Sequence, residues 1–323
     1  MTAPSLRPMF PHCVDSTMLA SFRSCPQKFF RQYVQHWKPQ AESVHLIAGG
    51  AFASGVEAAR RAFYEHNASP QDAEAEGLKA LITHYGDFDP PPASPKSLER
   101  MCGALEFYFA SYPLGEDGMT PISFPNGRQG IELSFAEPLP FPHPVTEDPI
   151  LFTGRSDMVA HFAGGTYIVD EKTTSSLGAS WARQWEMRAQ FTGYGWACQQ
   201  IGVQTEGTIV RGVSILKTKY DTMQVVTNRA QFEIDRWLDQ TVRDLQRMQR
   251  MWEEGYWDYA LDHACAEYGG CSLTQICKSP DPDSWLPMYF AKRVWDPLAR
   301  RELTVQEWEA SWGHDTSSET QGA

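Results

Sequence analysis

Residues 150–194 constrain the fold of this 323-residue chain more than any other stretch, because they combine strand signals with charged residues. The runs Ile150–Phe152 and Tyr167–Val169 are rich in β-branched and aromatic residues, and Gly164-Gly165 stands between them. Such side chains favour strands, whereas glycine pairs favour tight turns. The stretch therefore predicts a β-hairpin.

Each strand of the predicted hairpin has an acidic residue close to its apolar run, Asp157 on the first strand and Asp170 on the second. Side chains two residues apart in a strand point to the same face, so Asp170 and Lys172 project together and Glu171 projects to the other side. Burying charge is costly without a partner or a metal. Two carboxylates and a lysine on one face therefore predict a site for a hard divalent cation, which prefers oxygen ligands.

A helix is expected after the hairpin, with Ser180 as its N-cap and Trp181 as its first residue. Gln190 and Tyr194 are four residues apart and should therefore share one face of this helix.

Three motifs occur in order within the 41 residues from 154 to 194: Gly154-Arg155-Ser156-Asp157, Val169-Asp170-Glu171-Lys172 and Gln190-x-x-x-Tyr194. This series resembles the PD-(D/E)xK nucleases of the RecB/AddB type, whose relatives include CRISPR-adaptation nucleases and phage recombination exonucleases. The alternative is a surface hairpin with solvated charges.

The resemblance implies an α/β fold with a restriction-endonuclease-like core, in which helices flank a mixed, mostly antiparallel sheet. It also implies that Asp157 and Asp170 bind Mg²⁺ or Mn²⁺ and that Lys172 acts near the attacking water. Gln190 and Tyr194 would contact DNA or support the catalytic site.

Residues 47–66 are expected to form a helix whose small residues let another backbone approach closely. Similar nucleases carry a histidine near the start of this helix and a glutamate on the same face. Here Ala53 stands at the histidine position, and Glu57 follows four residues later. The resemblance makes Glu57 a third metal-binding carboxylate, with a solvated charge as the alternative. Similar nucleases often have a glutamate before the hairpin, so the resemblance implies that Glu132 supports the site.

Seven cysteines in a chain without an export signal indicate a reducing compartment and thiol ligands rather than disulfides. Cys265, Cys271 and Cys277 follow a Cys-x5-Cys-x5-Cys pattern, and thiolates suit Zn²⁺ or an iron–sulfur cluster. Cys25 lies in SxLxxFxxCPxxFFxxYV, which resembles the N-terminal signature of the same nucleases. The resemblance implies a C-terminal [4Fe–4S] clasp on these four cysteines, although the first pair of the C-terminal three is usually closer together. Zn²⁺ and ordinary buried thiols are the alternatives.

The formal net charge of −12 argues against a broad electrostatic grip on nucleic acid, although a local basic groove can coexist with an acidic exterior. The candidate phosphate contacts are basic residues near the acidic hairpin. They are Arg155, Arg183, Arg188 and Lys217, together with Arg211 and Lys219. Each of them, taken singly, has the alternative of a plain surface charge.

The sequence also predicts the order of elements. Helices are expected over 17–37 (interrupted at Pro26), 47–66, 70–87, 95–112 and 229–256, and strands over 130–135, 206–217 and 223–227. We expect an N-terminal helical region (1–128) that contributes Cys25 and Glu57, and a nuclease core (129–228). A C-terminal part of the same domain (229–311), with the long helix and the cysteines, and a disordered tail (312–323) would follow.

Together these patterns predict a metal-dependent DNA nuclease that hydrolyses phosphodiesters. The resemblance favours an exonuclease in recombination, repair or phage DNA processing, acting on single-stranded DNA or on free ends, with a recombination protein as a conceivable partner. The alternatives are a non-catalytic DNA-binding subunit that has kept the fold and a site-specific endonuclease. No run of eighteen apolar residues and no secretory signal is present, so we expect a cytoplasmic protein of a bacterium or phage-infected cell.

Overall fold

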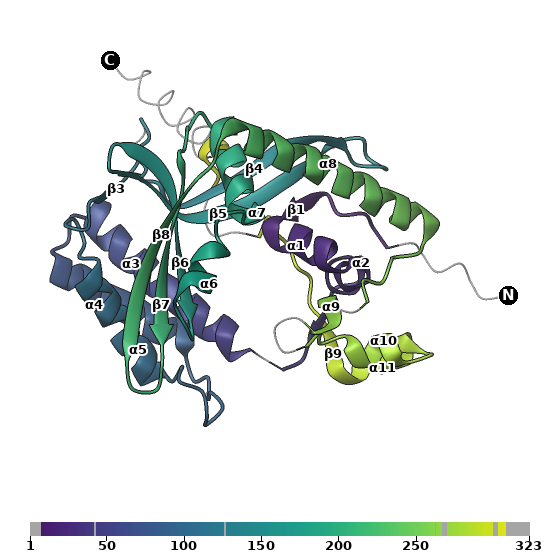
Figure 1. The fold of residues 1–323 in the computed structure, drawn as a ribbon, viewed down its shortest axis with the longest axis horizontal. Coiled ribbons are helices and arrows are strands. Elements are labelled where there is room, and N and C mark those ends of the chain that lie inside the picture. Colours follow the sequence, from purple (N-terminus) through teal and green to yellow (C-terminus); the bar gives the residue numbers. More distant parts are fainter. Residues whose placement is uncertain are drawn as a thin grey trace, which may run out of the picture. The chain divides into compact units, whose positions relative to one another are not determined.

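The computed structural model describes residues 8–41, 43–125, 127–261, 263–266, 270–299 and 303–307 (Figure 1). The chain divides into two compact units. The first comprises Met1–Ala41, Ala136–Gly154 and Asp235–Arg301, and the second comprises Glu42–Phe135, Arg155–Ile234 and Glu302–Ala323. The boundary falls within two strands and one helix, namely β4 (Ile131–Pro142), β5 (Pro149–Phe162) and α8 (Gln231–Glu254).

The second unit is built on a mixed sheet. From β5 the order runs through β6 (Gly165–Thr174) and β7 (Gly207–Ile215) to β8 (Tyr220–Asn228), while β3 (Met119–Pro121) and β4 also pair with β5. The β5–β6 and β7–β8 pairs are antiparallel, and the β6–β7 pair is parallel. With helices on this sheet, the predicted α/β class is confirmed.

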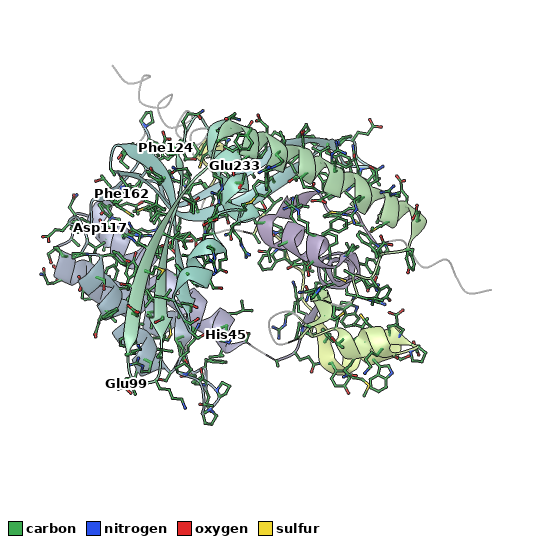
Figure 2. All side chains as sticks on the ribbon, viewed as in Figure 1. His45, Glu99, Asp117, Phe124, Phe162 and Glu233 are labelled. Carbon is green, nitrogen blue, oxygen red and sulfur yellow. The ribbon has the colours of Figure 1, made fainter. Side chains whose placement is uncertain are left out.

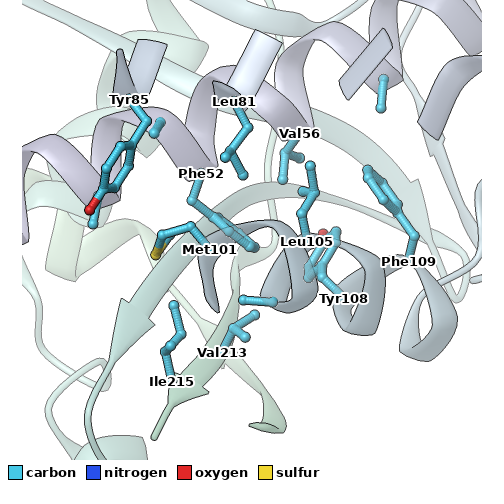
Figure 3. Close-up of a cluster of buried hydrophobic side chains, with 14 of the residues drawn as sticks. Phe52, Val56, Leu81, Tyr85, Met101, Leu105, Tyr108, Phe109, Val213 and Ile215 are labelled. Atoms are coloured by element: carbon cyan, nitrogen blue, oxygen red, sulfur yellow. The ribbon is translucent and has the colours of Figure 1, made fainter. Parts of the chain in front are cut away.

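Three helices of the second unit form its main apolar core. They are α3 (Val44–Tyr64), α4 (Pro70–Tyr85) and α5 (Leu98–Ser111). Their side chains pack with Val213 and Ile215 of β7, as Figure 3 shows. A Cβ on Gly77 would lie 2.7 Å from the Gly55 carbonyl oxygen, so these glycines allow α3 and α4 to approach closely, as predicted for the small residues of α3.

The first unit contains the N-terminal end of the described chain. Strand β1 (Cys13–Asp15) runs parallel to the beginning of β5 and leads into α1 (Ser16–Ser24), α2 (Pro26–Phe29) and a π-helix, η1 (Phe30–Val34). Strand β2 (Trp37–Pro39) pairs antiparallel with β9 (Phe290–Lys292). The remaining elements are α8 and the short helices α9 (His263–Ala266), α10 (Thr274–Lys278) and α11 (Pro282–Tyr289).

Most predicted elements are found, with two corrections. The predicted helix from Trp181 is wrong as a single element, because α6 (Ala179–Arg183) ends early and α7 (Ala189–Gln200) begins after a turn. Gly178, not Ser180, is the N-cap of α6. The domain boundaries at 128 and 228 stay a prediction, and the tail 312–323 lies outside the described residues. No helix of the described residues is long and apolar enough to span a membrane.

Candidate active site

The hairpin of β5 and β6 brings Asp157 and Asp170 together. Their neighbours Met158 and Val169 are paired across the two strands. Asp157 Oδ2 accepts a hydrogen bond from the Glu171 backbone N–H at 3.0 Å. Burial, and then the negative charge of Asp170, raise the pKa of Asp157 to about 7. A carboxyl group with this pKa gives up its proton readily when a cation arrives.

Lys172 lies on the same face, as the strand alternation predicts. Its Nζ is 2.5 Å from Asp170 Oδ1. Burial raises the pKa of Asp170, and the Lys172 ammonium partly offsets that rise. Burial alone would lower the pKa of Lys172, but the Asp170 and Asp157 carboxylates raise it. The lysine is therefore a cation positioned between acids, not a neutral base.

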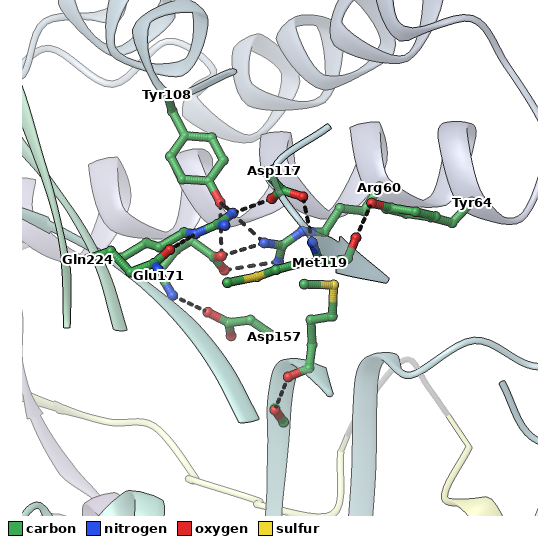
Figure 4. Close-up of polar contacts among 11 residues, drawn as sticks. Arg60, Tyr64, Tyr108, Asp117, Met119, Asp157, Glu171 and Gln224 are labelled. Atoms are coloured by element: carbon green, nitrogen blue, oxygen red, sulfur yellow. Dashed lines mark hydrogen bonds and ion pairs between the residues drawn. The ribbon is translucent and has the colours of Figure 1, made fainter. Parts of the chain in front are cut away.

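Glu171 points the other way, into a buried polar network drawn in Figure 4. Arg60 of α3 contacts both of its carboxylate oxygens, with Nη1 at 3.0 Å from Oε2. The Tyr108 hydroxyl of α5 donates to Oε1 at 3.0 Å. Arg211 of β7 lies 3.5 Å from that hydroxyl and forms an ion pair with Asp117 at 2.6 Å. Burial raises the pKa of Glu171, but Arg60 outweighs burial and the pKa is lowered.

This network holds β6 from the sheet face to which Glu171 points. Because the Glu171 backbone N–H holds Asp157 while the Glu171 side chain is held by Arg60, the same residue links the acidic face to the helices. Sequence reasoning missed Arg60 and Tyr108. Nothing in the local sequence marks them, since their partner lies 111 and 63 residues further along the chain.

Two more carboxylates lie near the hairpin. Glu132 of β4 is 3% exposed, and its Oε2 lies 2.5 Å from Arg155 Nε. Burial, then the charges of Asp157 and, less strongly, Glu57, raise the pKa of Glu132 well above its usual value, against the opposing charge of Arg155. Glu57 is half-buried on α3 and pairs with Arg61 at 3.1 Å. The backbone of Glu132 has a φ of +49°, a strained conformation of the kind that clusters at functional sites.

Gln190 and Tyr194 lie together on α7, as predicted. Gln190 Nε2 donates to the Tyr194 hydroxyl at 3.2 Å, and the tyrosine ring packs edge-on against Phe135. Burial raises the pKa of Tyr194, and the charges of Asp170 and Asp157 add to the rise. The phenol therefore lies within electrostatic reach of the acidic face.

A divalent cation fits the chemistry of this donor set. Asp170 Oδ1 and Glu132 Oε2 are buried oxygens that accept no hydrogen bond, although each is part of an ion pair. Such oxygens suit a hard cation. Within the described residues, no group of three or more His, Cys, Asp or Glu side chains stands arranged around a metal position. The metal roles of Asp157, Asp170 and Glu57 stay a prediction.

The candidate phosphate contacts differ in exposure. Arg155, Arg183, Arg188 and Lys217 are exposed, and the charge of Arg188 acts on Asp170. The interpretation of Arg211 as a phosphate contact is wrong, because its side chain is 2% exposed and is occupied by Asp117 and Gln224. An arginine in the middle of a strand looks exposed in sequence but here fills the interior.

The four cysteines predicted as cluster ligands belong to the first unit, and all are free thiols. Cys25 is the N-cap residue of α2, and Cys265 and Cys277 lie in α9 and α10. The Cys271 backbone N–H donates to the Cys265 carbonyl at 2.9 Å. Burial raises the pKa of Cys277 to about 11, and charges on Cys271, Cys25 and Cys265 add to that rise. The described part of the chain shows no metal-binding group here either.

Comparison with known proteins adds a family and two structural likenesses. A search of curated proteins found no match. A crystal structure of a candidate exonuclease from Eubacterium rectale is 13% identical, covers 79% of this chain and 87% of its own, and has a TM-score of 0.49. The crystal structure of SSO0001 is 15% identical, covers 59% and 74%, and has a TM-score of 0.26. Neither likeness carries an argument at these scores.

The family match is more extensive. The model of the PD-(D/E)XK nuclease superfamily matches residues 16–278, which include the acidic hairpin, α3 and the cysteines of α9 and α10. The chain therefore belongs to the PD-(D/E)XK nuclease superfamily.

Proposed function

We propose that this protein is a metal-dependent DNA nuclease that hydrolyses phosphodiester bonds at the acidic face of β5 and β6. The observation that carries the proposal is the grouping of two carboxylates, the half-buried Asp157 and the buried Asp170, with the Lys172 ammonium 2.5 Å from Asp170. Three charged groups of this kind are costly to keep together without a function, because burial penalises each of them.

Asp157 and Asp170 would hold Mg²⁺ or Mn²⁺, with Glu57 as a third carboxylate. When bound, such a cation supplies Lewis-acid polarisation of the scissile phosphate and lowers the pKa of a coordinated water. Glu132, paired with Arg155, would support Asp157 from β4.

Lys172 would orient the attacking water and stabilise the charge that develops on the phosphate. Its pKa is raised by the neighbouring acids, so it stays protonated and donates rather than accepts. The hydrogen-bonded pair of Gln190 and Tyr194 would support this arrangement from α7. Arg155, Arg183, Arg188 and Lys217 would contact phosphates along the substrate, since exposed basic side chains bind the backbone without reading sequence.

The finer assignment is an exonuclease of the RecB/AddB type in recombination, repair or phage DNA processing. Its support is the series of motifs from Gly154 to Tyr194 together with the N-terminal pattern around Cys25. A [4Fe–4S] cluster on Cys25, Cys265, Cys271 and Cys277 belongs to the same proposal. The electrostatic influence of Cys271, Cys25 and Cys265 on the Cys277 thiol supports it, because thiolate sets of this kind suit iron–sulfur clusters or Zn²⁺.

The proposal is tested with end-labelled linear and closed circular DNA, single- and double-stranded, incubated with Mg²⁺ or Mn²⁺ and with EDTA. We expect metal-dependent release of nucleotides from linear DNA, and its loss in Asp170→Ala and Lys172→Ala. Cleavage of circular DNA would replace the exonuclease assignment by an endonuclease. Binding without cleavage under any metal would show a non-catalytic subunit. Undiminished cleavage by Asp170→Ala, or cleavage in EDTA, would remove the site assignment.

A further inference from the structure

The middle of α8 carries a basic surface in the first unit that has no role in the acidic site. Its exposed side chains between residues 240 and 250 are two glutamines and three arginines, which we call the arginine face. Together they line a hollow of about 440 Å³. These residues are Gln240, Arg243, Gln246, Arg247 and Arg250.

The acidic residues of α8 are distributed so as to leave this face uniformly basic. Asp235 and Asp239 lie before it, and Glu253 and Glu254 lie after it. Asp244 lies within the same span but is fully buried, where it pairs with Arg23 at 2.7 Å. No exposed carboxylate of α8 therefore interrupts the positive charge between Gln240 and Arg250.

The three arginines are not equally occupied. Arg247 lies 3.8 Å from Asp244 and over the ring of Phe22, at 5.3 Å from its centroid. In the described part of the chain, Arg243 and Arg250 form no ion pair and no side-chain hydrogen bond. Exposed guanidinium groups have five donors each and bind phosphate in a forked geometry. Arg243 and Arg250 are therefore available to bind an anionic ligand, although the formal net charge of the chain is −12.

We propose that the arginine face binds the phosphate backbone of DNA. The proposal rests on the proposed function in taking the same substrate. Arg243 and Arg250 are seven residues apart, which is two helical turns or about 10 Å along the helix axis. Phosphates of one strand of duplex DNA are spaced by about 3.4 Å along its axis, so the two guanidinium groups span about three of them.

The composition of the face indicates contact without base readout. Arginine and glutamine side chains both donate to phosphate and sugar oxygens, and such contacts fix the position of DNA but carry no sequence information. This suits an enzyme that must act on any sequence. An acidic protein would be attracted to the same charges, but it would not require the regular spacing of forked donors.

The test measures DNA binding, not cleavage. Full-length Asp170→Ala protein in EDTA binds fluorescein-labelled duplex or single-stranded DNA, and anisotropy gives the affinity at several salt concentrations. The variant Arg243→Gln/Arg250→Gln is compared with the control Lys79→Gln/Arg293→Gln, which removes the same charge at exposed positions outside the α8 sequence. Arg243→Lys/Arg250→Lys keeps the charge and controls for folding.

Each lost phosphate contact lowers the slope of log affinity against log salt by about 0.9 for duplex DNA. We expect the glutamine variant to lose about 1.8 from the slope. When the salt concentration rises from 50 to 200 mM, the fold decrease in DNA affinity should therefore be about 12 times smaller for the glutamine variant than for the parent. The lysine variant and the control pair should keep the parental slope.

Two results would overturn the proposal. One is a glutamine variant whose slope equals that of the control pair. The other is unchanged DNA binding together with a selective loss of binding to poly-glutamate, which would assign the face to an acidic protein. These outcomes can be distinguished from those of the proposed function. If the wild type cleaves DNA but the glutamine variant keeps the parental salt slope, only the arginine face is refuted. If the glutamine variant loses salt slope but the wild type never cleaves DNA, only the nuclease assignment is refuted.

Discussion

Replacing Arg60 by methionine should destabilise the protein strongly, because it leaves Glu171 charged and buried. The two side chains are 4% and 2% exposed, and Arg60 contacts both oxygens of Glu171. Removing one partner of a buried ion pair costs about 3–5 kcal/mol. A typical domain has a free energy of unfolding of about 5–15 kcal/mol, so Arg60→Met should remove a large part of it.

The pH dependence of this effect follows from the pKa of Glu171. In the wild type that pKa is lowered below 4.5, so Glu171 contributes stability that is present above pH 4.5 and is lost as pH falls through the folded pKa. Without Arg60, we expect burial to outweigh the remaining Arg211 charge and Tyr108 hydrogen bond and to raise the pKa of Glu171 above 4.5. The stability of the variant should then decrease as pH rises from 4.5 through the raised pKa, so the two proteins should differ more at pH 8 than at pH 5.

Urea unfolding followed by circular dichroism at pH 5 and pH 8 measures both effects. The double variant Arg60→Met/Glu171→Gln is the control, since it removes the pair without leaving a buried charge and should recover much of the loss. A loss below about 1 kcal/mol in Arg60→Met, an equal loss at both pH values, or a double variant no better than the single one would refute the reasoning.

Further predictions concern the acids and the cysteines. Asp157→Asn should stabilise the metal-free protein above pH 7 but not near pH 4, because it removes the cost of keeping this carboxylate charged in the folded state. Moving the carboxyl pKa from 3.8 to about 7 corresponds to a cost of about 4 kcal/mol. Thermal unfolding in EDTA checks this prediction, and a stability difference that does not change with pH would contradict it. Glu57→Gln should raise the Mn²⁺ concentration that half-saturates cleavage, and an unchanged titration would return Glu57 to a solvated charge. Anaerobically purified wild type should contain about four irons per chain, and Cys25→Ser should contain almost none. One zinc per chain and no iron would show that the clasp is a zinc site, and the absence of any metal would refute the clasp.

The acidic face could be predicted because its signals are local. Strand alternation separates Asp170 and Lys172 from Glu171 over only three residues, and the structure confirms this separation. Gln190 and Tyr194 likewise needed only helical spacing, and they remain together although the helix begins later than expected.

The supporting network could not be predicted, since its contacts are set by tertiary packing. Arg60 looks like one of several surface charges on a helix, and only the packing of α3 on the sheet buries it against Glu171. Arg211 was misinterpreted for the same reason. Its partner Asp117 lies 94 residues earlier, in the loop before β3, and sequence spacing gives no sign of that contact. Figure 2 shows Asp117 among the side chains of this unit.

Two tryptophans lie at the break between α6 and α7. Trp181 of α6 and Trp185 of the turn that follows α6 are both buried and pack edge-on. Apolar residues at this spacing also suit a continuous helix, so periodicity alone predicted one element where the structure has two.

Direct binding of Mn²⁺ tests the central claim, that the carboxylates of β5 and β6 hold a divalent cation. Electron paramagnetic resonance of free Mn²⁺ gives the affinity of the wild type, of Asp170→Asn, and of the exposed control Asp72→Asn on α4. We predict saturable binding by the wild type and the control, and an affinity more than about tenfold weaker in Asp170→Asn. Equal Mn²⁺ binding by Asp170→Asn and the wild type would contradict the assignment of the metal site.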